Sequence, residues 1–359
     1  LPIGQKEILE KFKHESLINF YKDWYRPNLM SVIVVGDIDV AEMEKKIISH
    51  FSSYKNPVNE KPRKFYDVPN HKETFVAVES DKEASSAQVQ LIYKDYGAPK
   101  PIVNIGDFKN YIVEGLFSTL LNTRLDELTN SSTPPFTYGY SYYGGTFARN
   151  KKAYQSVAMS QEDKQLSALQ VLVTENERAK KFGFTQGELE RSKAQFLASI
   201  EKAYNDRNKM NSVSFVGEYQ ANFLEKQVVP GIEWTYQTMK QLMPLIDLKD
   251  VNSLIKDYVK EDNRVIILTG PEKEGLKKVT EQQVLDALKV NADDLKPYED
   301  AAVATSLMRN EVKPGTIVSR ESNTKIGTKT LVLSNGVKVT YKNTDFKNDE
   351  VLFEAVSLG

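Results

Sequence analysis

A helix that runs into an almost wholly apolar strand occurs twice in this chain, and this repeat constrains the fold more than any other feature. Near the start, a helical pattern leads to Asn28 and then to the apolar run Val32–Val35. Much later, another helical pattern leads to Asn263 and then to the apolar run Val265–Leu268. A strand that is apolar on both faces is typical of a sheet interior. Together with the strand and helix patterns between its copies, the repeat predicts an α+β chain of duplicated domains. Each domain would be an antiparallel-rich sheet with helices packed on one face.

The first copy of this unit has clear boundaries in the sequence. Residues 5–24 have apolar side chains at roughly helical spacing. Pro27 ends that helix, because proline has no N–H and disfavours helix in the residue before it. Ser31–Val35 is then expected to be a buried strand. Asp39 predicts the start of the next helix, with Glu42 three residues later as in a capping box.

Strand and helix patterns alternate between the two copies. Residues 52–71 contain three prolines among polar residues and are typical of a linker. Ser160 and Thr185 each stand three residues before an acidic residue, which predicts the N-caps of two helices. Two pairs of strands are expected, at residues 73–79 with 87–93 and at 138–147 with 153–159. Helices are expected at residues 108–128, 166–180, 189–204, 208–225, 233–243 and 250–259, before a closing strand at 264–269.

The chain after Gly270 loses its periodicity apart from a short helix at residues 280–289. Loops of this length without structure are uncommon inside compact domains, so this stretch indicates a linker. Apolar residues then alternate on both sides of Asn335-Gly336, which predicts a hairpin. A further strand is expected at residues 351–358.

Composition excludes several classes of function. The chain has 48 basic and 49 acidic residues, so no overall field attracts nucleic acid or an anionic membrane. No run approaches the roughly 18 consecutive apolar residues needed to span a bilayer. There is no cysteine, and the three histidines, His14, His50 and His71, are too scattered to place two ligands on one helix. The motif His-x-x-Glu-His is absent as well. We therefore assign no catalytic, cofactor-binding or metal-binding residue.

The most suggestive local feature is the aromatic run at residues 136–147. Tyr138, Tyr140 and Tyr142 alternate along an expected strand and so share one of its faces. Tyrosine offers an apolar ring with a polar tip, and the intervening glycines let another backbone approach. One interpretation is a chamber wall in which these tyrosines contact an extended peptide. The other is an ordinary antiparallel strand with glycine at a bulge or bend.

Charged residues elsewhere are expected to be solvated or paired. Glu188 and Glu190 stand in a charged stretch, which gives no support for the burial that acid–base chemistry needs. Arg124, at the end of the long helix, is expected to form a surface or inter-helix ion pair.

These elements, in this order, resemble the pitrilysin/insulinase family of zinc metallopeptidases. The resemblance rests on several short features: Ile3-Gly4, a helix ending in Phe20-Tyr21, the turn Tyr25–Asn28, the strand Val32–Val35 with Gly36-Asp37, and a helix ending at Phe51. Arg124–Leu128 is similar to the family's RLxEL, and Leu333–Val339 to the LxNGxxV that opens a new unit.

The resemblance implies a division of the chain into five parts. They are residues 1–56 as the C-terminal part of a first, catalytic-type domain, 57–71 as a linker, 72–270 as a second, non-catalytic domain, 271–328 as an inter-half linker and 329–359 as the start of a third domain. It also implies that the chain is a piece of a longer zinc metallopeptidase whose zinc motif lies before Leu1. Zinc is then expected in the parent protein, and no cofactor in this part of it.

The expected partners follow from the same resemblance. They are a peptide or unfolded polypeptide as the parent's substrate, and the remaining domains of the same chain, with no nucleic acid and no transmembrane segment. Two alternatives stay open: a non-catalytic scaffold or core-subunit homologue of the family, and an unrelated peptide-binding α+β module. The lack of cysteine is a weak indication of an exported or periplasmic bacterial protein. The sequence gives no other information on the compartment.

Overall fold

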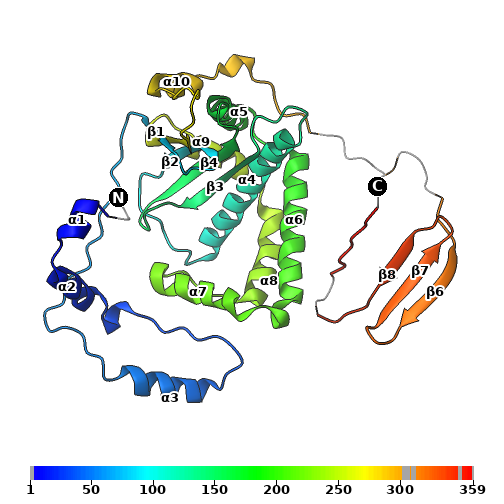
Figure 1. The fold of residues 1–359 in the computed structure, drawn as a ribbon, viewed down its shortest axis with the longest axis horizontal. Helices are drawn as coiled ribbons and strands as arrows, with labels where there is room; N and C mark the ends of the chain where they lie inside the picture. Colours follow the sequence, from blue (N-terminus) through cyan, green and yellow to red (C-terminus); the bar gives the residue numbers. More distant parts are fainter. Residues whose placement is uncertain (1–3, 301–307, 309–312, 347–349, 358–359) are drawn as a thin grey trace.

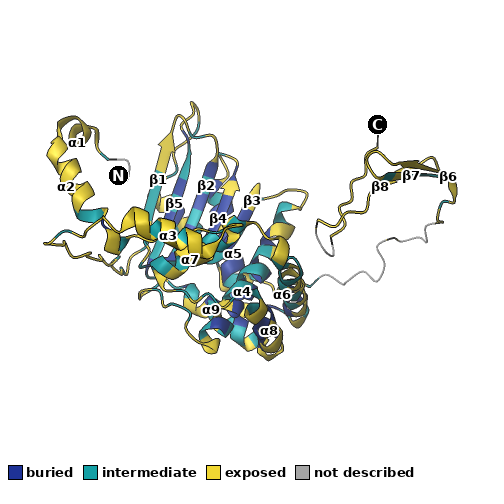
Figure 2. Cartoon of the chain, turned by 90° about the horizontal axis from the view of Figure 1, so that it is seen from below, coloured by how far each residue is buried: buried dark blue, intermediate teal, exposed yellow. Residues whose placement is uncertain are grey.

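A five-stranded sheet organises the middle of the molecule. The computed structural model describes residues 4–300, 308, 313–346 and 350–357. The strand order is β1-β5-β2-β4-β3 (Figure 2). The strands are β1 (Phe75–Asp81), β2 (Ala87–Lys94), β3 (Tyr138–Gly145), β4 (Lys152–Ser160) and β5 (Arg264–Pro271). Only the β1–β5 pair is parallel, so the sheet is antiparallel-rich as expected.

The position of β5 corrects one predicted pairing. β1 and β2 were expected to pair directly, but β5 lies between them and bonds to both. Alternation along a strand shows that it has a buried face. It does not show which neighbour the strand takes, and here the residues of β1 pair with residues 190 positions later in the sequence.

Helices cover one face of this sheet. α4 (Ile105–Thr129) packs against β3, and α5 (Gln165–Phe182) packs against β2 and β4. α6 (Gln186–Asn205) and α9 (Leu248–Tyr258) pack on α4, and α8 (Ile232–Leu242) packs on α6. The fold is therefore α+β with helices on one face of the main sheet.

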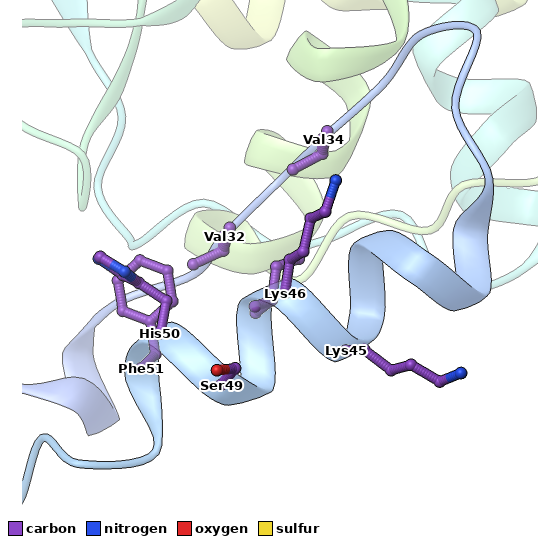
Figure 3. A pocket seen from close by; sticks show the side chains of 8 residues that line it. Val32, Val34, Lys45, Lys46, Ser49, His50 and Phe51 are labelled. Carbon is purple, nitrogen blue, oxygen red and sulfur yellow. The ribbon is translucent and has the colours of Figure 1, made fainter.

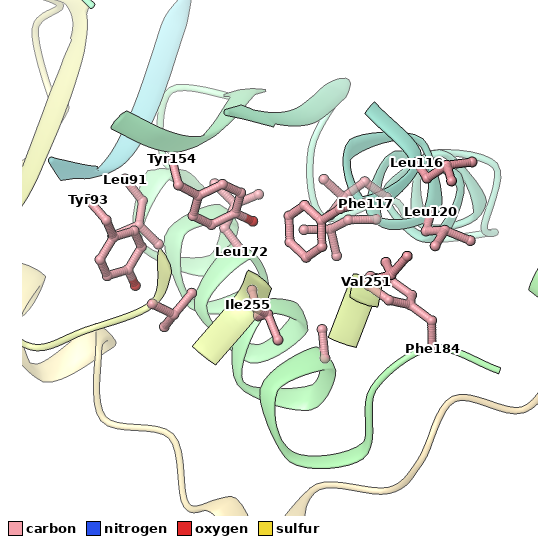
Figure 4. Packing of buried hydrophobic residues seen from close by; sticks show 14 of the residues in the cluster. Leu91, Tyr93, Leu116, Phe117, Leu120, Tyr154, Leu172, Phe184, Val251 and Ile255 are labelled. Atoms are coloured by element: carbon pink, nitrogen blue, oxygen red, sulfur yellow. The ribbon is translucent and has the colours of Figure 1, made fainter. Parts of the chain in front are cut away.

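The hydrophobic core lies between these helices and the sheet. Leu91 and Tyr93 of β2 alternate with half-exposed residues and face the helices. Figure 4 shows Phe117 of α4 directed toward Tyr154 of β4, with Leu172 of α5 and others around them. The predicted stripe of the long helix is confirmed, since all of its members are buried: Ile112, Leu116, Leu120, Leu121 and Leu125.

Helix capping shows which local sequence signals were sufficient. Thr185 accepts a hydrogen bond from the backbone N–H of Glu188, whose side chain bonds back, so the predicted cap of α6 is confirmed as a full capping box. Ser160 is not a cap, because β4 continues through it and the N-cap of α5 is Lys164. The hydroxyl of Ser160 instead donates to the carbonyl of Gln161.

The N-terminal region contains three short helices and stands apart from the main sheet (Figure 1). The single helix expected at residues 5–24 is two helices, α1 (Lys6–Lys11) and α2 (His14–Trp24), separated by extended Phe12 and Lys13. Pro27 begins the 3-10 turn η1 (Pro27–Leu29), and α3 (Val40–Phe51) follows. The predicted cap of α3 is confirmed, since Asp39 Oδ1 accepts from the N–H of Glu42 at 2.8 Å.

The buried strand predicted at Ser31–Val35 is absent. This stretch joins neither sheet of the described residues, and Val32 and Val34 are 46% and 42% exposed. An interior strand needs neighbours that bond its N–H and C=O groups, and an apolar composition cannot supply them. Within the described residues, the first copy of the repeat therefore has no strand equivalent to β5.

The remaining helices and 3-10 turns lie between or after these helices in the chain. They are η2 (Arg207–Lys209), α7 (Ser212–Glu225), η3 (Met243–Leu245), α10 (Glu281–Ala287) and η4 (Ala292–Asp294). No helix among the described residues is long and apolar enough to cross a membrane.

A second, antiparallel sheet of three strands closes the chain: β6 (Ile317–Asn323), β7 (Thr328–Leu333) and β8 (Lys338–Tyr341). The predicted hairpin is β7–β8, and Gly336 takes the left-handed conformation its turn requires, with φ of 86°. The strand expected at 351–358 is not formed over residues 351–357, and its last residue lies outside the described ranges.

Candidate functional site

The face of the main sheet away from the helices carries a row of tyrosines. Tyr138, Tyr140 and Tyr142 alternate with buried Gly139 and Ser141 along β3, so their rings all lie on this open face. Successive ring centroids are 5.5 and 5.8 Å apart, and Tyr140 and Tyr142 are stacked. The structure thus brings the three sequence-predicted residues together on one surface.

The neighbouring strand supports the row. Tyr138, Tyr140 and Tyr142 stand opposite Met159, Val157 and Gln155 of β4. Cross-strand pairs of this kind hold side chains in place. Partial burial raises the pKa of Tyr142. Its hydroxyl, like that of any tyrosine at neutral pH, is protonated and can donate a hydrogen bond.

A hollow of about 400 Å³ lies beside the row on the same face. Its apolar lining comes from Ile92, Val265 and Ile267, which alternate with core residues on β2 and β5. Tyr142 and the exposed Phe147 add aromatic surface. Its polar lining includes Gln90, Lys94 and Gln155. An apolar hollow with a few polar groups at its rim suits a side chain of a bound polypeptide.

The outer edge of β3 is partly closed by a side chain from α4. Asn122 Nδ2 donates to the carbonyl of Ser141 at 3.0 Å, and Asn122 Oδ1 accepts from the N–H of Ser141 at 2.6 Å. The amide therefore bonds Ser141 as a neighbouring strand would, which protects an edge from strand addition. The sequence patterns did not single out this residue. Its only signal is an asparagine in the middle of a long helix, where asparagine is a poor helix former.

The first glycine of the aromatic run has a structural reason. A Cβ on Gly139 would lie 2.6 Å from the ring of Phe136, which is buried beneath the strand end. Gly139 therefore admits a core aromatic ring, and it is not needed for the approach of a peptide.

The expectation that Glu188 is solvated is wrong. Glu188 is 4% exposed and binds Arg124, which is 2% exposed, through two hydrogen bonds of 2.7 and 2.8 Å. The pair joins α4 to the start of α6, so the inter-helix form of the predicted ion pair is the one observed. Both oxygens of Glu188 are occupied by Arg124 and by the N–H of Thr185, which indicates a structural and not a catalytic role.

A second hollow, of about 880 Å³, lies between the extended residues 32–34 and α3 (Figure 3). It is lined by Val32, Val34, Ile47 and Phe51 together with Lys45, Lys46, Ser49 and His50. Apolar side chains from both walls are exposed to solvent there. This surface has the character of an uncovered core and offers no convergent set of polar groups.

The described residues do not fit a zinc site. They contain no group of three or more histidine, cysteine, aspartate or glutamate side chains that could hold a metal ion. His14 begins α2, and His50 lies in the last turn of α3. His71 stacks on Phe75 with ring centroids 3.9 Å apart and bonds the carbonyl of Glu73 through Nδ1. No chemistry that passes through a metal can be assigned to these side chains.

The chain is similar in sequence to a longer protein. The chain is 28% identical over 364 residues to a protein of Arabidopsis thaliana named zinc protease PQQL-like, covering all of this chain and 34% of that protein. The chain thus spans about a third of the length of this curated relative.

Two solved structures have a similar fold. The periplasmic protease PqqL from Escherichia coli superposes with a TM-score of 0.72 at 21% identity, over 95% of this chain and 38% of the other. A mutant of the ferredoxin protease FusC, solved in complex with Arabidopsis ferredoxin, gives a TM-score of 0.61 at 16% identity, with the same coverage.

The family itself follows from the sequence match. The model of the peptidase M16 inactive domain matches residues 11–196, which is more than half of the chain. This match sets aside the alternative of an unrelated peptide-binding module. The chain belongs to the peptidase M16 inactive-domain family, in agreement with its resemblance to the pitrilysin/insulinase peptidases.

Proposed function

We propose that this non-catalytic family domain forms part of the chamber wall of a longer zinc-dependent metalloendopeptidase, and that its open sheet face contacts the peptide substrate. Tyr138, Tyr140 and Tyr142 would line that chamber. The observation that carries the proposal is the row of neighbouring tyrosine rings beside an apolar hollow, on a sheet face that no helix covers among the described residues.

The outer edge of β3 limits the ways in which a peptide could bind. Because Asn122 already occupies both backbone groups of Ser141, a peptide would contact the tyrosine rings and the hollow before it could add as a strand there. Ring faces and an apolar hollow accept many sequences, so the wall would bind extended polypeptides with little preference for sequence.

Zinc and the residue that activates water would belong to other parts of the parent protein. When bound, zinc would supply Lewis acidity and a nucleophilic water. We keep the domain division predicted from the sequence. Residues 1–56 would complete a catalytic-type domain, 72–270 would form the inactive domain, 57–71 and 271–328 would be linkers, and a third domain would start at 329.

The substrate and compartment are proposed by analogy. The FusC mutant was solved in complex with ferredoxin, which is itself a protein. We propose a peptide or unfolded polypeptide as the substrate of the parent. PqqL of E. coli is described as a periplasmic protease, and we propose an exported or periplasmic location for the parent.

Substitution of the row in the full-length parent tests the proposal. Tyr140→Ala and Tyr142→Ala should each raise KM for long peptides by about tenfold and leave kcat nearly unchanged, because they remove binding remote from the bond that is cut. A dipeptide-sized substrate, too short to reach the row, should be unaffected. Tyr111→Ala is the matched control, since Tyr111 is an exposed tyrosine on α4, outside the sheet.

The same experiment can refute the proposal. An equal effect on short and long substrates, or unaltered KM for both, would leave the tyrosines with a packing role only. Tyr140→Phe keeps the ring and should retain most of the affinity for long peptides, so its behaviour separates ring contacts from the hydroxyl.

A further inference from the structure

The segment that follows η4 is bound to the helical layer by aromatic and charged contacts. The ring of Tyr298 lies 4.3 Å from the Arg124 guanidinium, and the ring of Phe184 lies 4.6 Å from it. The Tyr298 hydroxyl lies 2.7 Å from both carboxylate oxygens of Glu127. A tyrosine from outside the layer therefore completes the surroundings of the buried Arg124–Glu188 pair.

Asp300 makes a second anchor at the start of α6. Its Oδ1 accepts from Arg191 Nη2 at 2.6 Å and its Oδ2 from Arg191 Nη1 at 3.2 Å, an arrangement of two parallel bonds. The hydroxyl of Thr185, the N-cap of α6, also donates to Oδ2 at 3.2 Å. These contacts hold the pKa of Asp300 below its ordinary value, chiefly through the Arg191 hydrogen bonds.

A glycine makes room for this carboxylate. A Cβ on Gly187 would lie 2.4 Å from Asp300 Oδ2, closer than any side chain allows. Gly187 has no positive φ that would require glycine, and it lies in the first turn of α6, where alanine is the better helix former. Alanine at this position would therefore require the Asp300 carboxylate to move.

A third contact holds η4, which directly precedes this segment. Lys181 Nζ donates to the carbonyl of Ala292 at 2.5 Å and lies 3.8 Å from the carboxylate of Asp293. The contacts at Ala292, Tyr298 and Asp300 span one short stretch of chain, on a surface built from the ends of α4 and α5 and the start of α6.

We propose that residues 292–300 are a docked strap, and that the surface formed by Arg124, Phe184, Gly187 and Arg191 is its receptor. The strap fixes the point at which the chain leaves the helical layer. The last attached residue before the sheet β6-β7-β8 is therefore Asp300, and not a residue at the end of α10. This role depends neither on the tyrosine row nor on any peptidase activity.

A surface loop without specific contacts would not require these residue types. Surface ion pairs alone contribute little, so an ordinary loop needs no glycine cradle, no paired bonds to arginine and no ring over a buried guanidinium. The pattern is that of a peptide bound to a prepared site, with an aromatic residue and a carboxylate two positions apart as its anchors.

Spin labels can test whether the strap is docked. The chain has no cysteine, so cysteines introduced at the exposed positions Glu299 and Ala194 would be the only labelled sites. Electron paramagnetic resonance on the full chain should give one narrow distribution of label-to-label distance. Gly187→Ala should broaden it, because the new methyl group displaces the Asp300 carboxylate. Gly217→Ala in α7 is the matched control, since its Cβ would meet no atom within 4 Å, and it should leave the distribution narrow.

A second variant keeps the test valid if Gly187→Ala fails to fold. Asp300→Asn preserves the shape of the side chain and loses its charge, and it should also broaden the label-to-label distribution, because it weakens the charge-assisted pair with Arg191. Folding of each variant is checked by its thermal unfolding midpoint, which Gly187→Ala should maintain or raise. A broad distribution in the unsubstituted chain, or a narrow one in both Gly187→Ala and Asp300→Asn, would overturn the proposal.

Discussion

Helices α3 and α4 show what an amphipathic pattern does and does not determine. Both were predicted from apolar residues at helical spacing, and both form. α4 has nine buried residues and packs between β3 and other helices, whereas α3 has none, and its Ile48 and Phe51 are 56% and 44% exposed. A pattern gives a helix an apolar face, but burial needs a second surface to cover it. In the longer parent proposed above, other parts of the protein would supply that second surface for the N-terminal region.

Buried arginines give the sharpest test of this difference. Arg124 is bonded twice to buried Glu188, whereas Arg26, also buried, lies 3.5 Å from Glu60, which is 36% exposed in its side chain. Arg124→Met should lower the free energy of unfolding of the main-sheet domain by about 3–5 kcal/mol, because it leaves an unpaired buried carboxylate. Arg26→Met should cost about 1 kcal/mol or less, because Glu60 can be solvated.

The two tryptophans allow each region to be followed separately. Trp24 lies in α2 and Trp234 in α8, where it packs against Phe108. In a Trp24→Phe background, urea denaturation followed by the fluorescence of Trp234 reports on the main-sheet domain alone. Similar losses for both arginine variants would show that the N-terminal region is already part of one cooperative core.

A pair of truncations extends the comparison to apolar side chains. Leu121→Ala in α4 should lower the free energy of unfolding by about 2–5 kcal/mol, since Leu121 is fully buried and leaves a cavity. Ile48→Ala in α3 should change it by no more than about 0.5 kcal/mol in this chain, because the side chain is already exposed. In the full-length parent, Ile48→Ala should become clearly destabilising. A neutral result there would contradict the proposal that other parts of the parent bury the apolar face of α3.

Alkaline pH should weaken the main-sheet domain through its buried tyrosines. Burial raises the pKa of Tyr154 from its usual value of 10 to about 12, and it also raises the pKa values of Tyr93, Tyr143 and Tyr258. Unfolded tyrosines ionise first, so the free energy of unfolding is unaffected below pH 10 and falls as pH rises toward 12, by about 3 kcal/mol for Tyr154 alone. Urea denaturation at a series of pH values measures this, and Tyr154→Phe should lose that share of the pH dependence. A pH-independent midpoint above pH 10 would contradict it.

Local signals predicted much of the fold. The stripe that ends at Leu125, the cap at Thr185 and the β3–β4 pair all follow from residues close in sequence, and all are present. Asn263, noted for its place in the repeat, takes a left-handed φ of 53°, and its side chain accepts a hydrogen bond from the N–H of His71. Asparagine tolerates this conformation better than most residues, and its side chain ties the start of β5 to the distant residues Asn70 and His71.

What failed depends on contacts between distant residues. Local periodicity carries no information on the insertion of β5 between β1 and β2, or on whether Ser31–Val35 finds strand partners. The burial of Glu188 depends on Arg124, 64 residues earlier, so its charged neighbours in sequence were misleading. The tyrosine row could be placed on one face by alternation, but the hollow beside it combines residues of four separate segments of the chain, and Asn122 closes the strand edge from another helix.

The most direct test of the proposed function is a covalent record of where a peptide binds. A photo-crosslinking phenylalanine derivative would replace Tyr140 in the full-length parent, with Tyr111 as the control position, and long peptides would be added before irradiation. We expect crosslinks to the peptide from position 140 that unlabelled peptide suppresses, and none above background from position 111. Equal crosslinking from both positions, or none from position 140 while the peptide is bound, would contradict a peptide-contacting role for the open face.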